Sequence, residues 1–166
     1  MFAKYKPHDN SLYNKLVILS RNIFFYKKLQ LKDNFETRII LIFIHFAIVL
    51  IVFKSKNKKK FPQVIFDNIF QNIEYHLREL GHGDVSVNKK MKILTKIFYD
   101  ILLKLNNKKS KFFSANKSLI KKHLVDQNKI NDAFLDEFSQ YTENFYNFCF
   151  ELNINSVLKG EINFNN

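Results

Sequence analysis

The chain contains few of the residues that punctuate β-rich or disulfide-bonded proteins. Its 166 residues include three glycines, two prolines and a single cysteine, Cys149. So few turn-forming residues argue against a many-stranded sheet, whereas long stretches without them suit helices. A single cysteine excludes an intrachain disulfide and a CxxC metal site, so we expect Cys149 to be a small core residue in a reducing compartment. The sequence therefore predicts an all-α fold.

Acidic residues are also scarce. The chain carries 27 lysines and arginines against 15 aspartates and glutamates, a net charge of +12. An excess of this sign favours anionic partners such as RNA or lipid head groups, although the lysine-rich composition of an AT-rich genome would produce part of it. The charge is uneven, because residues 1–60 carry 13 basic and 3 acidic groups and residues 130–166 carry 1 and 6. This asymmetry favours a functional basic face.

The sequence lacks the motifs of the common enzyme and metal-binding classes. It has no GxGxxG, GxxxxGK[ST], HExxH, GxSxG or EF-hand pattern. The five histidines are scattered, without a spacing that would place two of them on one helix face. We therefore expect no enzymatic activity, no metal or other cofactor and no DNA partner. We interpret His45 as a core histidine whose ring is hydrogen-bonded rather than as a haem ligand.

Charge is absent from residues 39–53, a run of fifteen residues between Arg38 and Lys54. A helix of that length measures about 22 Å, whereas a bilayer core of about 30 Å usually requires about 20 apolar residues. The run therefore favours a buried helix at the centre of a single-domain bundle that covers residues 1–166. A span or an element inserted in the membrane is the alternative.

Apolar periodicity predicts about six helices in all. Besides the central one, they cover residues 12–29, 65–80, 87–105, 119–125 and 130–152. Residues 32–34 break the first helix, and Gly81 and Gly83 mark a tight corner. We expect both glycines to adopt positive φ angles, with Asp84 or Ser86 capping the helix that follows.

Lysines cluster in three places. The connector 54–60 and one face of the fourth helix supply the candidates for binding a ribosome or an anionic membrane: Lys56, Lys58, Lys59, Lys60, Lys89, Lys92 and Lys96. The alternative for the connector is a plain solvated loop. A third basic stretch, residues 106–117, is predicted to be a loop that Phe112 and Phe113 pin to the body.

The last helix carries the strongest periodic signal, a stripe of mostly aromatic residues. Its members are Ile130, Phe134, Phe138, Tyr141, Phe145, Phe148 and Leu152. Such a stripe is typical of a core face. A groove that binds a hydrophobic client has the same pattern and is the alternative.

Several segments together carry a family resemblance. They are Tyr13, Val17, residues 20–21, residues 25–26, residues 31–38, His45, the stretch LRELGHGDVSVNKKMKILTKIFY at 77–99, and Leu158, Gly160, Glu161, Ile162 and Phe164. The chain resembles the ubiquinol-cytochrome c chaperone family over about residues 12–164. The motif residues are Arg38, His45, Arg78, Gly81, Gly83, Asp84, Phe98 and Tyr99. Three positions depart from the family pattern, because His82 replaces an aliphatic residue and Asp100 with Ile101 replaces glycine and arginine. The central helix also ends in Phe53 and Lys54, where arginine and leucine are typical.

The resemblance implies an all-helical, non-enzymatic chaperone that assists newly made cytochrome b during assembly of the cytochrome bc complex. The implied partners are cytochrome b, the ribosome, an anionic membrane surface and a small partner chaperone. The N-terminal residues 1–13 have the form of neither a signal peptide nor a transit peptide, so we expect a bacterial protein that is cytoplasmic and peripheral at the inner membrane. The alternative function is a basic helical module that binds RNA or membranes and is unrelated to respiration.

Overall fold

A long central helix and the helices around it form the described structure. The computed structural model describes residues 11–124 and 131–166. These residues contain seven α-helices, one π-helical turn and no β-strand apart from a single bridge. The elements are α1 Ser11–Ser20, η1 Phe24–Lys28, α2 Phe35–Lys56, α3 Gln63–Glu79, α4 Asp84–Lys104, α5 Lys117–His123, α6 Asp132–Glu151 and α7 Ile154–Leu158. The predicted all-α fold is confirmed, and α7 is added to the six helices expected.

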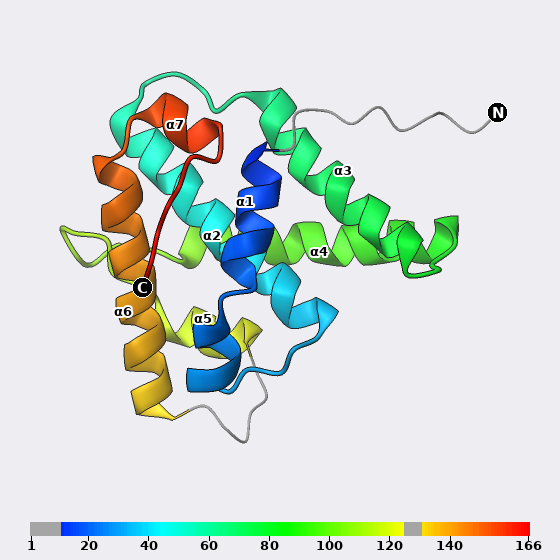
Figure 1. The fold of residues 1–166 in the computed structure, drawn as a ribbon, viewed down its shortest axis with the longest axis horizontal. Coiled ribbons are helices and arrows are strands. Elements are labelled where there is room, and N and C mark those ends of the chain that lie inside the picture. Colours follow the sequence, from blue (N-terminus) through cyan, green and yellow to red (C-terminus); the bar gives the residue numbers. More distant parts are fainter. Residues whose placement is uncertain (1–10, 125–130) are drawn as a thin grey trace.

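Helix α2 lies at the centre of the arrangement (Figure 1). It contacts α1, α4, α6 and α7, and every residue from 39 to 49 is buried. A helix that is apolar all round is stable in water only when other elements cover it on several sides. The surrounding helices provide that cover, so the predicted position of the uncharged run is confirmed.

Helix α2 is longer than the fifteen residues expected. It begins at Phe35, because the Asn34 side chain accepts a hydrogen bond from the Thr37 N–H at 2.9 Å, and it continues to Lys56. Its 22 residues measure about 33 Å, so the expectation that it falls short of a membrane span was wrong. Within the described residues it is the one helix that could cross a membrane by length and composition, yet 72% of its apolar window is buried. Burial, rather than length, identifies α2 as a core helix.

The first predicted helix ends at Ser20 instead of near Leu29. The Ser20 hydroxyl donates to the Val17 carbonyl at 2.7 Å, and the Asn22 side chain accepts from the Phe24 N–H at 3.0 Å. Such local side-chain bonds compete with continuation of a helix, and here they start the separate turn η1. Ile23, which lies within the predicted helix 12–29, is consequently 60% exposed.

The aromatic stripe of α6 faces the core. Phe138, Tyr141 and Phe145 are at most 1% exposed. The ring of Phe25 lies 4.8 Å from that of Tyr141, and the ring of Phe164 lies 5.3 Å from that of Phe145. The alternative of an open client groove lined by this stripe is therefore wrong, because other elements cover it. Ile130, the first residue of the predicted stripe, lies outside the described residues.

Helices α3 and α4 run out from the body together and meet at a tight corner (Figure 1). Gly81 has a φ of +93°, as expected. Its N–H donates to the Arg78 carbonyl at 3.0 Å, and the His82 N–H donates to the Leu77 carbonyl at 3.3 Å. This pair of hydrogen bonds is the Schellman helix end, which requires a positive φ at the glycine.

The second glycine of the corner differs from its prediction. Gly83 has a φ of −76° and precedes α4 as its N-cap without any side-chain hydrogen bond. Neither Asp84 nor Ser86 is therefore the cap. Asp84 is the first residue of α4, and its carboxylate pairs with the Arg78 guanidinium, which also binds Glu74 at 3.1 Å. The arginine thus connects the two helices across the corner.

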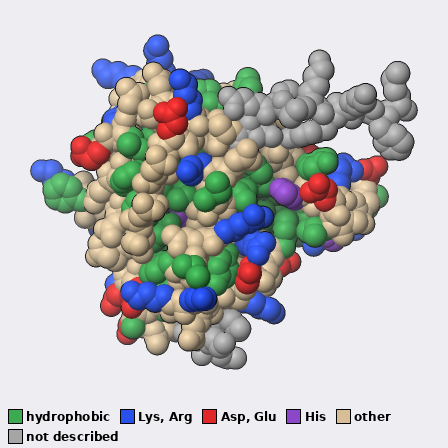
Figure 2. Space-filling model, viewed as in Figure 1, with side chains coloured by type: hydrophobic (Ala, Val, Ile, Leu, Met, Phe, Trp, Pro, Cys, Tyr) green, Lys and Arg blue, Asp and Glu red, His purple; other side chains and the backbone are tan. Residues whose placement is uncertain are grey.

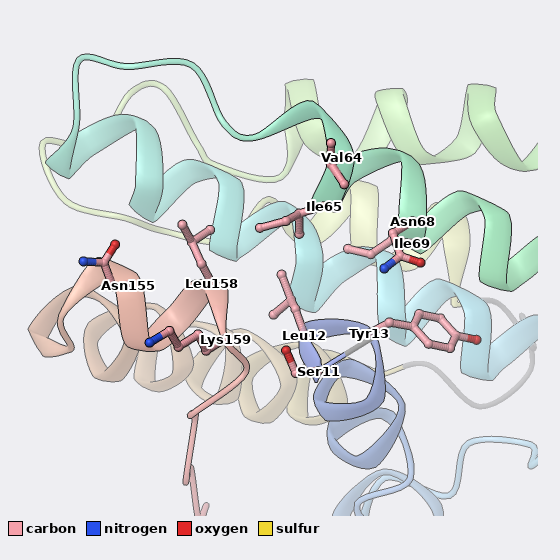
Figure 3. A pocket seen from close by; sticks show the side chains of 10 residues that line it. All are labelled: Ser11, Leu12, Tyr13, Val64, Ile65, Asn68, Ile69, Asn155, Leu158 and Lys159. Atoms are coloured by element: carbon pink, nitrogen blue, oxygen red, sulfur yellow. The ribbon is translucent and has the colours of Figure 1, made fainter. Parts of the chain in front are cut away.

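The C-terminal segment closes the fold against the start of α1. Figure 3 shows α7 beside the first turns of α1 and α3, around a hollow of about 400 Å³. Gly160 has a φ of +73°, and a Cβ atom there would lie 2.5 Å from the Ser11 carbonyl oxygen. Beyond it Ile162 is buried, and the Phe164 ring contacts three aromatic rings of α6. The end of the described chain is therefore part of the core.

Helix α5 begins slightly earlier than predicted. The Asn116 side chain accepts hydrogen bonds from the Ser118 and Leu119 N–H groups and so caps it. Its last residue is His123, whose ring nitrogen lies 2.7 Å from the Asp100 carboxylate of α4. Val125, the end of the predicted helix, lies outside the described residues.

Candidate functional site

An open apolar groove lies between the C-terminal ends of α2 and α4. Its volume is about 880 Å³, and residues of the connector after α2 and of the loop after α4 line it. The floor consists of apolar side chains: Leu50, Ile51, Phe53, Phe61, Phe66, Leu102 and Leu103. Leu103 is 63% exposed, so the groove presents apolar surface to solvent.

Lysines from two loops border this groove. Lys58, Lys59 and Lys60 come from the connector 57–62, and Lys108 comes from the loop that follows α4. Lys54, at the end of α2, adds a fifth. Figure 2 shows lysine side chains projecting at the edges where Figure 1 draws these two segments. We call this site the lysine-rimmed groove.

The connector is held in place beside the groove. The Phe61 ring lies 5.2 Å from the buried Phe53 ring of α2. The Lys59 N–H donates to the Asn57 side chain at 3.0 Å, which fixes the turn before the lysines. The prediction of a lysine-rich connector is confirmed with a shift, because α2 continues through Lys56 and the connector proper begins at Asn57.

The loop after α4 is also built by local hydrogen bonds. Asn106 and Ala115 form a β-bridge, and the Asn107 N–H donates to the Ser114 carbonyl at 2.7 Å. The Phe113 ring stacks on Tyr146 of α6, with 4.5 Å between centroids. The prediction that Phe113 pins the loop is thus confirmed.

The companion prediction for Phe112 was wrong. Its side chain is 77% exposed, because Phe113 already occupies the position against Tyr146. Phe112 lies in a bend of the loop, whereas Phe113 follows the bend and contacts the body. Phe112 therefore projects from the loop among exposed lysines, Lys108, Lys109 and Lys111.

The other predicted lysines lie elsewhere. The Lys56 ammonium group donates to the carbonyl oxygens of Phe150 and Leu152 at 2.5 and 2.6 Å, so it contacts the C-terminal end of α6. Lysines of α4 are exposed on its outward face and do not line the groove: Lys89, Lys92 and Lys96. They alternate there with exposed Val85 and Ile93.

Most of the predicted motif residues have structural roles. Arg38 pairs with Asp33 at 2.7 Å ahead of α2, and Arg78 connects the corner. Phe98 is fully buried among four other phenylalanine rings, whereas its neighbour Tyr99 is 44% exposed beside a shallow hollow between α3 and α4. The motif therefore describes mainly how the helices are joined.

His45 is a buried histidine with both ring nitrogens in hydrogen bonds. Its Nδ1 lies 2.6 Å from the Leu41 carbonyl and its Nε2 lies 2.7 Å from the Tyr141 hydroxyl. Since a carbonyl can only accept, Nδ1 carries the proton and the tyrosine donates to Nε2. Burial lowers the pKa of His45 to about 4, so the ring is neutral near pH 7. The prediction of a hydrogen-bonded core histidine is confirmed.

The apolar residues of the groove floor were not among the site residues predicted from the sequence. Leu102 and Leu103 of α4 are not buried, and Leu50 and Ile51 lie within a run that is otherwise buried. The sequence feature that could have indicated the floor is the adjacent apolar pair Leu102 and Leu103, because the apolar periodicity of α4 does not place both residues in the core.

Among residues 11–124 and 131–166, no group of three His, Cys, Asp or Glu side chains is placed to hold a metal ion.

Comparison with known proteins agrees with this structure. Residues 27–164 match the sequence profile of the family described as ubiquinol-cytochrome C chaperone. The crystal structure of the Cbp3 homolog from Brucella abortus has the same fold, with a TM-score of 0.68 and 19% sequence identity over 95% of this chain and 88% of that one. No curated protein matches the chain significantly. Because the profile covers most of the chain, this protein belongs to the ubiquinol-cytochrome c chaperone family, and it is a chaperone of cytochrome bc assembly.

Proposed function

We propose that the lysine-rimmed groove binds an exposed apolar segment of newly made cytochrome b before that subunit is assembled. The family match supports the identity of the client. The observation that carries the site is the combination of an apolar floor of about 880 Å³ with a basic rim. No enzymatic step is required of such a protein.

The shape and chemistry of the groove suit this client. A membrane subunit that has not yet been inserted or assembled exposes apolar helix faces, which an apolar floor shields from water. The lysines of the rim repel other basic proteins and attract anionic groups near the client, such as lipid head groups or ribosomal RNA. The groove is open, so a segment can enter from the side.

The same charges support a proposal for the position in the cell. We propose a cytoplasmic protein that is peripheral at the inner membrane, where a bacterial cytochrome b would be made. The outward face of α4, with Lys89, Lys92 and Lys96, is the proposed contact for the ribosome. Binding of a small partner chaperone is a further proposal, which the resemblance alone supports.

Site-specific photo-crosslinking in cells tests the groove. A photoreactive phenylalanine analogue at Leu103 is expected to form an adduct with cytochrome b, because this side chain is 63% exposed on the groove floor. The matched control is the same probe at Ile18 of α1, which is 61% exposed outside the groove. Equal adducts at both positions, or none at Leu103, would show that the groove is not the client site.

Deletion of the gene tests the function independently of the site. We expect a marked loss of assembled cytochrome bc complex, restored by the wild-type chain. A normal amount of complex in the deletion strain would contradict the proposed function. Salt-dependent RNA binding with normal respiration would instead favour the basic RNA-binding module.

A further inference from the structure

The loop after α4 presents an exposed aromatic side chain among lysines. Phe112 is 77% exposed, and three neighbouring lysines of the loop are exposed as well: Lys108, Lys109 and Lys111. Figure 2 shows a hydrophobic side chain beside lysines at the edge where Figure 1 draws this loop. Exposure of a large aromatic side chain to water is unfavourable, so its presence on an ordered loop requires an explanation.

The loop is ordered by contacts that leave its tip free. The Asn116 N–H donates to the Leu105 carbonyl at 2.8 Å and the Asn106–Ala115 bridge closes the base. Phe113 stacks on Tyr146 and holds one side against α6. The backbone of Phe112 is itself restrained, because its N–H donates to the Ser110 hydroxyl at 3.3 Å. The exposure of Phe112 is therefore a feature of the loop's construction.

We infer that this loop docks the protein on an anionic bilayer, with Phe112 inserted at the interface and the three lysines among the head groups. Phenylalanine partitions into the interfacial region, and each lysine near an anionic leaflet adds attraction. The inference deepens the proposed peripheral location by naming the surface that meets the membrane.

The position of the loop relative to the groove supports this orientation. Lys108 belongs to both, and Lys58, Lys59 and Lys60 of the connector line the same groove. We expect a bilayer that meets the loop to attract this second group of lysines as well. The groove would then open next to the membrane surface, where an apolar client segment is present.

The bilayer is favoured over RNA by the aromatic tip. RNA would be held by the lysines alone or by stacking on an aromatic face, whereas insertion into lipid moves the ring out of water. The two differ in the environment that position 112 reports. The chain has no tryptophan, so a Phe112→Trp substitution provides a single tryptophan, whose emission can be excited selectively, at the tip.

The test uses the full chain and vesicles of phosphatidylcholine with or without one third phosphatidylglycerol. With the anionic vesicles we expect the emission of the Phe112→Trp variant to shift to the blue and to be quenched by brominated lipid. The control variant Ile18→Trp, whose position is 61% exposed on α1, is expected to stay unshifted. Emission at position 112 that RNA shifts and vesicles do not would overturn the inference.

Vesicle flotation of further variants separates the ring from the charge. Phe112→Ala is expected to weaken binding by about fivefold or more, and replacing Lys108, Lys109 and Lys111 by serine by about a hundredfold. Replacing Lys27, Lys32 and Lys121, which are exposed elsewhere, removes the same charge and is expected to matter far less. Equal losses of vesicle binding in the two lysine variants would show that binding depends only on net charge, which would overturn the inference.

Vesicle binding does not involve cytochrome b, so its failure would leave the client crosslink at Leu103 as a separate result.

Discussion

At the scale of single residues, His45 is a buried polar group within the hydrophobic core. It is 1% exposed and bonded to Leu41 and Tyr141. An unsatisfied ring nitrogen there would cost about 1–3 kcal/mol, so the tyrosine hydroxyl is needed as much as the histidine. The pair also joins α2 to α6 at the centre of the molecule.

The low pKa of His45 makes stability depend on pH. The folded-state pKa is about 4, whereas the unfolded value is about 6.5. Between these values the unfolded chain binds more protons, so stability is full above pH 6.5 and falls as the pH drops toward 4. From pH 7 to pH 5 we expect this group to contribute a loss of about 2 kcal/mol.

Urea denaturation at the two pH values measures the effect. The variant His45→Gln is expected to be less stable at pH 7, but to lose about 2 kcal/mol less than the wild type on acidification. Tyr141→Phe keeps the imidazole and serves as the control, with its pH dependence preserved. If the wild type and His45→Gln lost equal stability between pH 7 and pH 5, the assignment of this pH dependence to His45 would be wrong.

The three glycines provide a graded prediction. Alanine at Gly160 combines a φ of +73° with a Cβ atom 2.5 Å from the Ser11 oxygen, so we expect a loss of about 2–4 kcal/mol. Gly81→Ala meets only the strain of a φ of +93°, because its surroundings are open, and should cost about 1–2 kcal/mol. Gly83→Ala, at a φ of −76°, should change stability by less than about 0.5 kcal/mol. Thermal or urea unfolding of the three variants would contradict this order if Gly83→Ala were the most damaging.

At the scale of elements, Asp100 holds α5 against α4. Its carboxylate accepts from Lys104 of its own helix at 2.6 Å and from Lys122 and His123 of α5 at 2.8 and 2.7 Å. The neighbouring Lys104, Lys122 and His123 hold the pKa of this carboxyl well below its usual range. The position at which the family pattern has glycine thus carries an interhelix link in this chain.

Removal of the charge should loosen α5 selectively. We expect Asp100→Asn to destabilise the protein by about 1–2 kcal/mol, because the Asp100 and His123 side chains are only 16% and 10% exposed. Asp136→Asn, which breaks an exposed pair with Lys117, should cost less than about 0.5 kcal/mol. Urea unfolding compares the two, and hydrogen exchange should show the loss of protection concentrated in α5. Equal effects of both variants would argue against the special role of Asp100.

At the scale of the whole molecule, the lysine-rimmed groove gathers like charges without paired carboxylates among its lining residues. Replacing Lys58, Lys59 and Lys60 by serine should therefore leave stability within about 0.5 kcal/mol of the wild type or raise it slightly. The same variant should lower the amount of cytochrome bc complex in cells. Blue native gels together with urea unfolding check both parts. Normal complex with unchanged stability would indicate that these lysines are dispensable.

Elements with strong periodicity were predictable because the residues that define them are close together in the sequence. The buried stripe of α6, the corner at Gly81 and the central position of α2 follow from spacing, composition and the conformational freedom of glycine. The N-cap at Gly83, which has no side-chain hydrogen bond, was not predictable from these patterns. Nor was the break after Ser20, because single side-chain hydrogen bonds decide it. Such bonds differ little in sequence from those that a helix tolerates.

The sequence by itself determined the all-helical class, the buried uncharged helix, the basic character and the likeness to a chaperone family. Each of these depends on composition or on residues close together in the chain. Only the tertiary structure decided that Lys58, Lys59 and Lys60 share a groove with Leu103 and Lys108, and that Phe112 rather than Phe113 faces solvent. Contacts between residues so far apart in the sequence depend on how the helices pack, and no local sequence pattern specifies that packing.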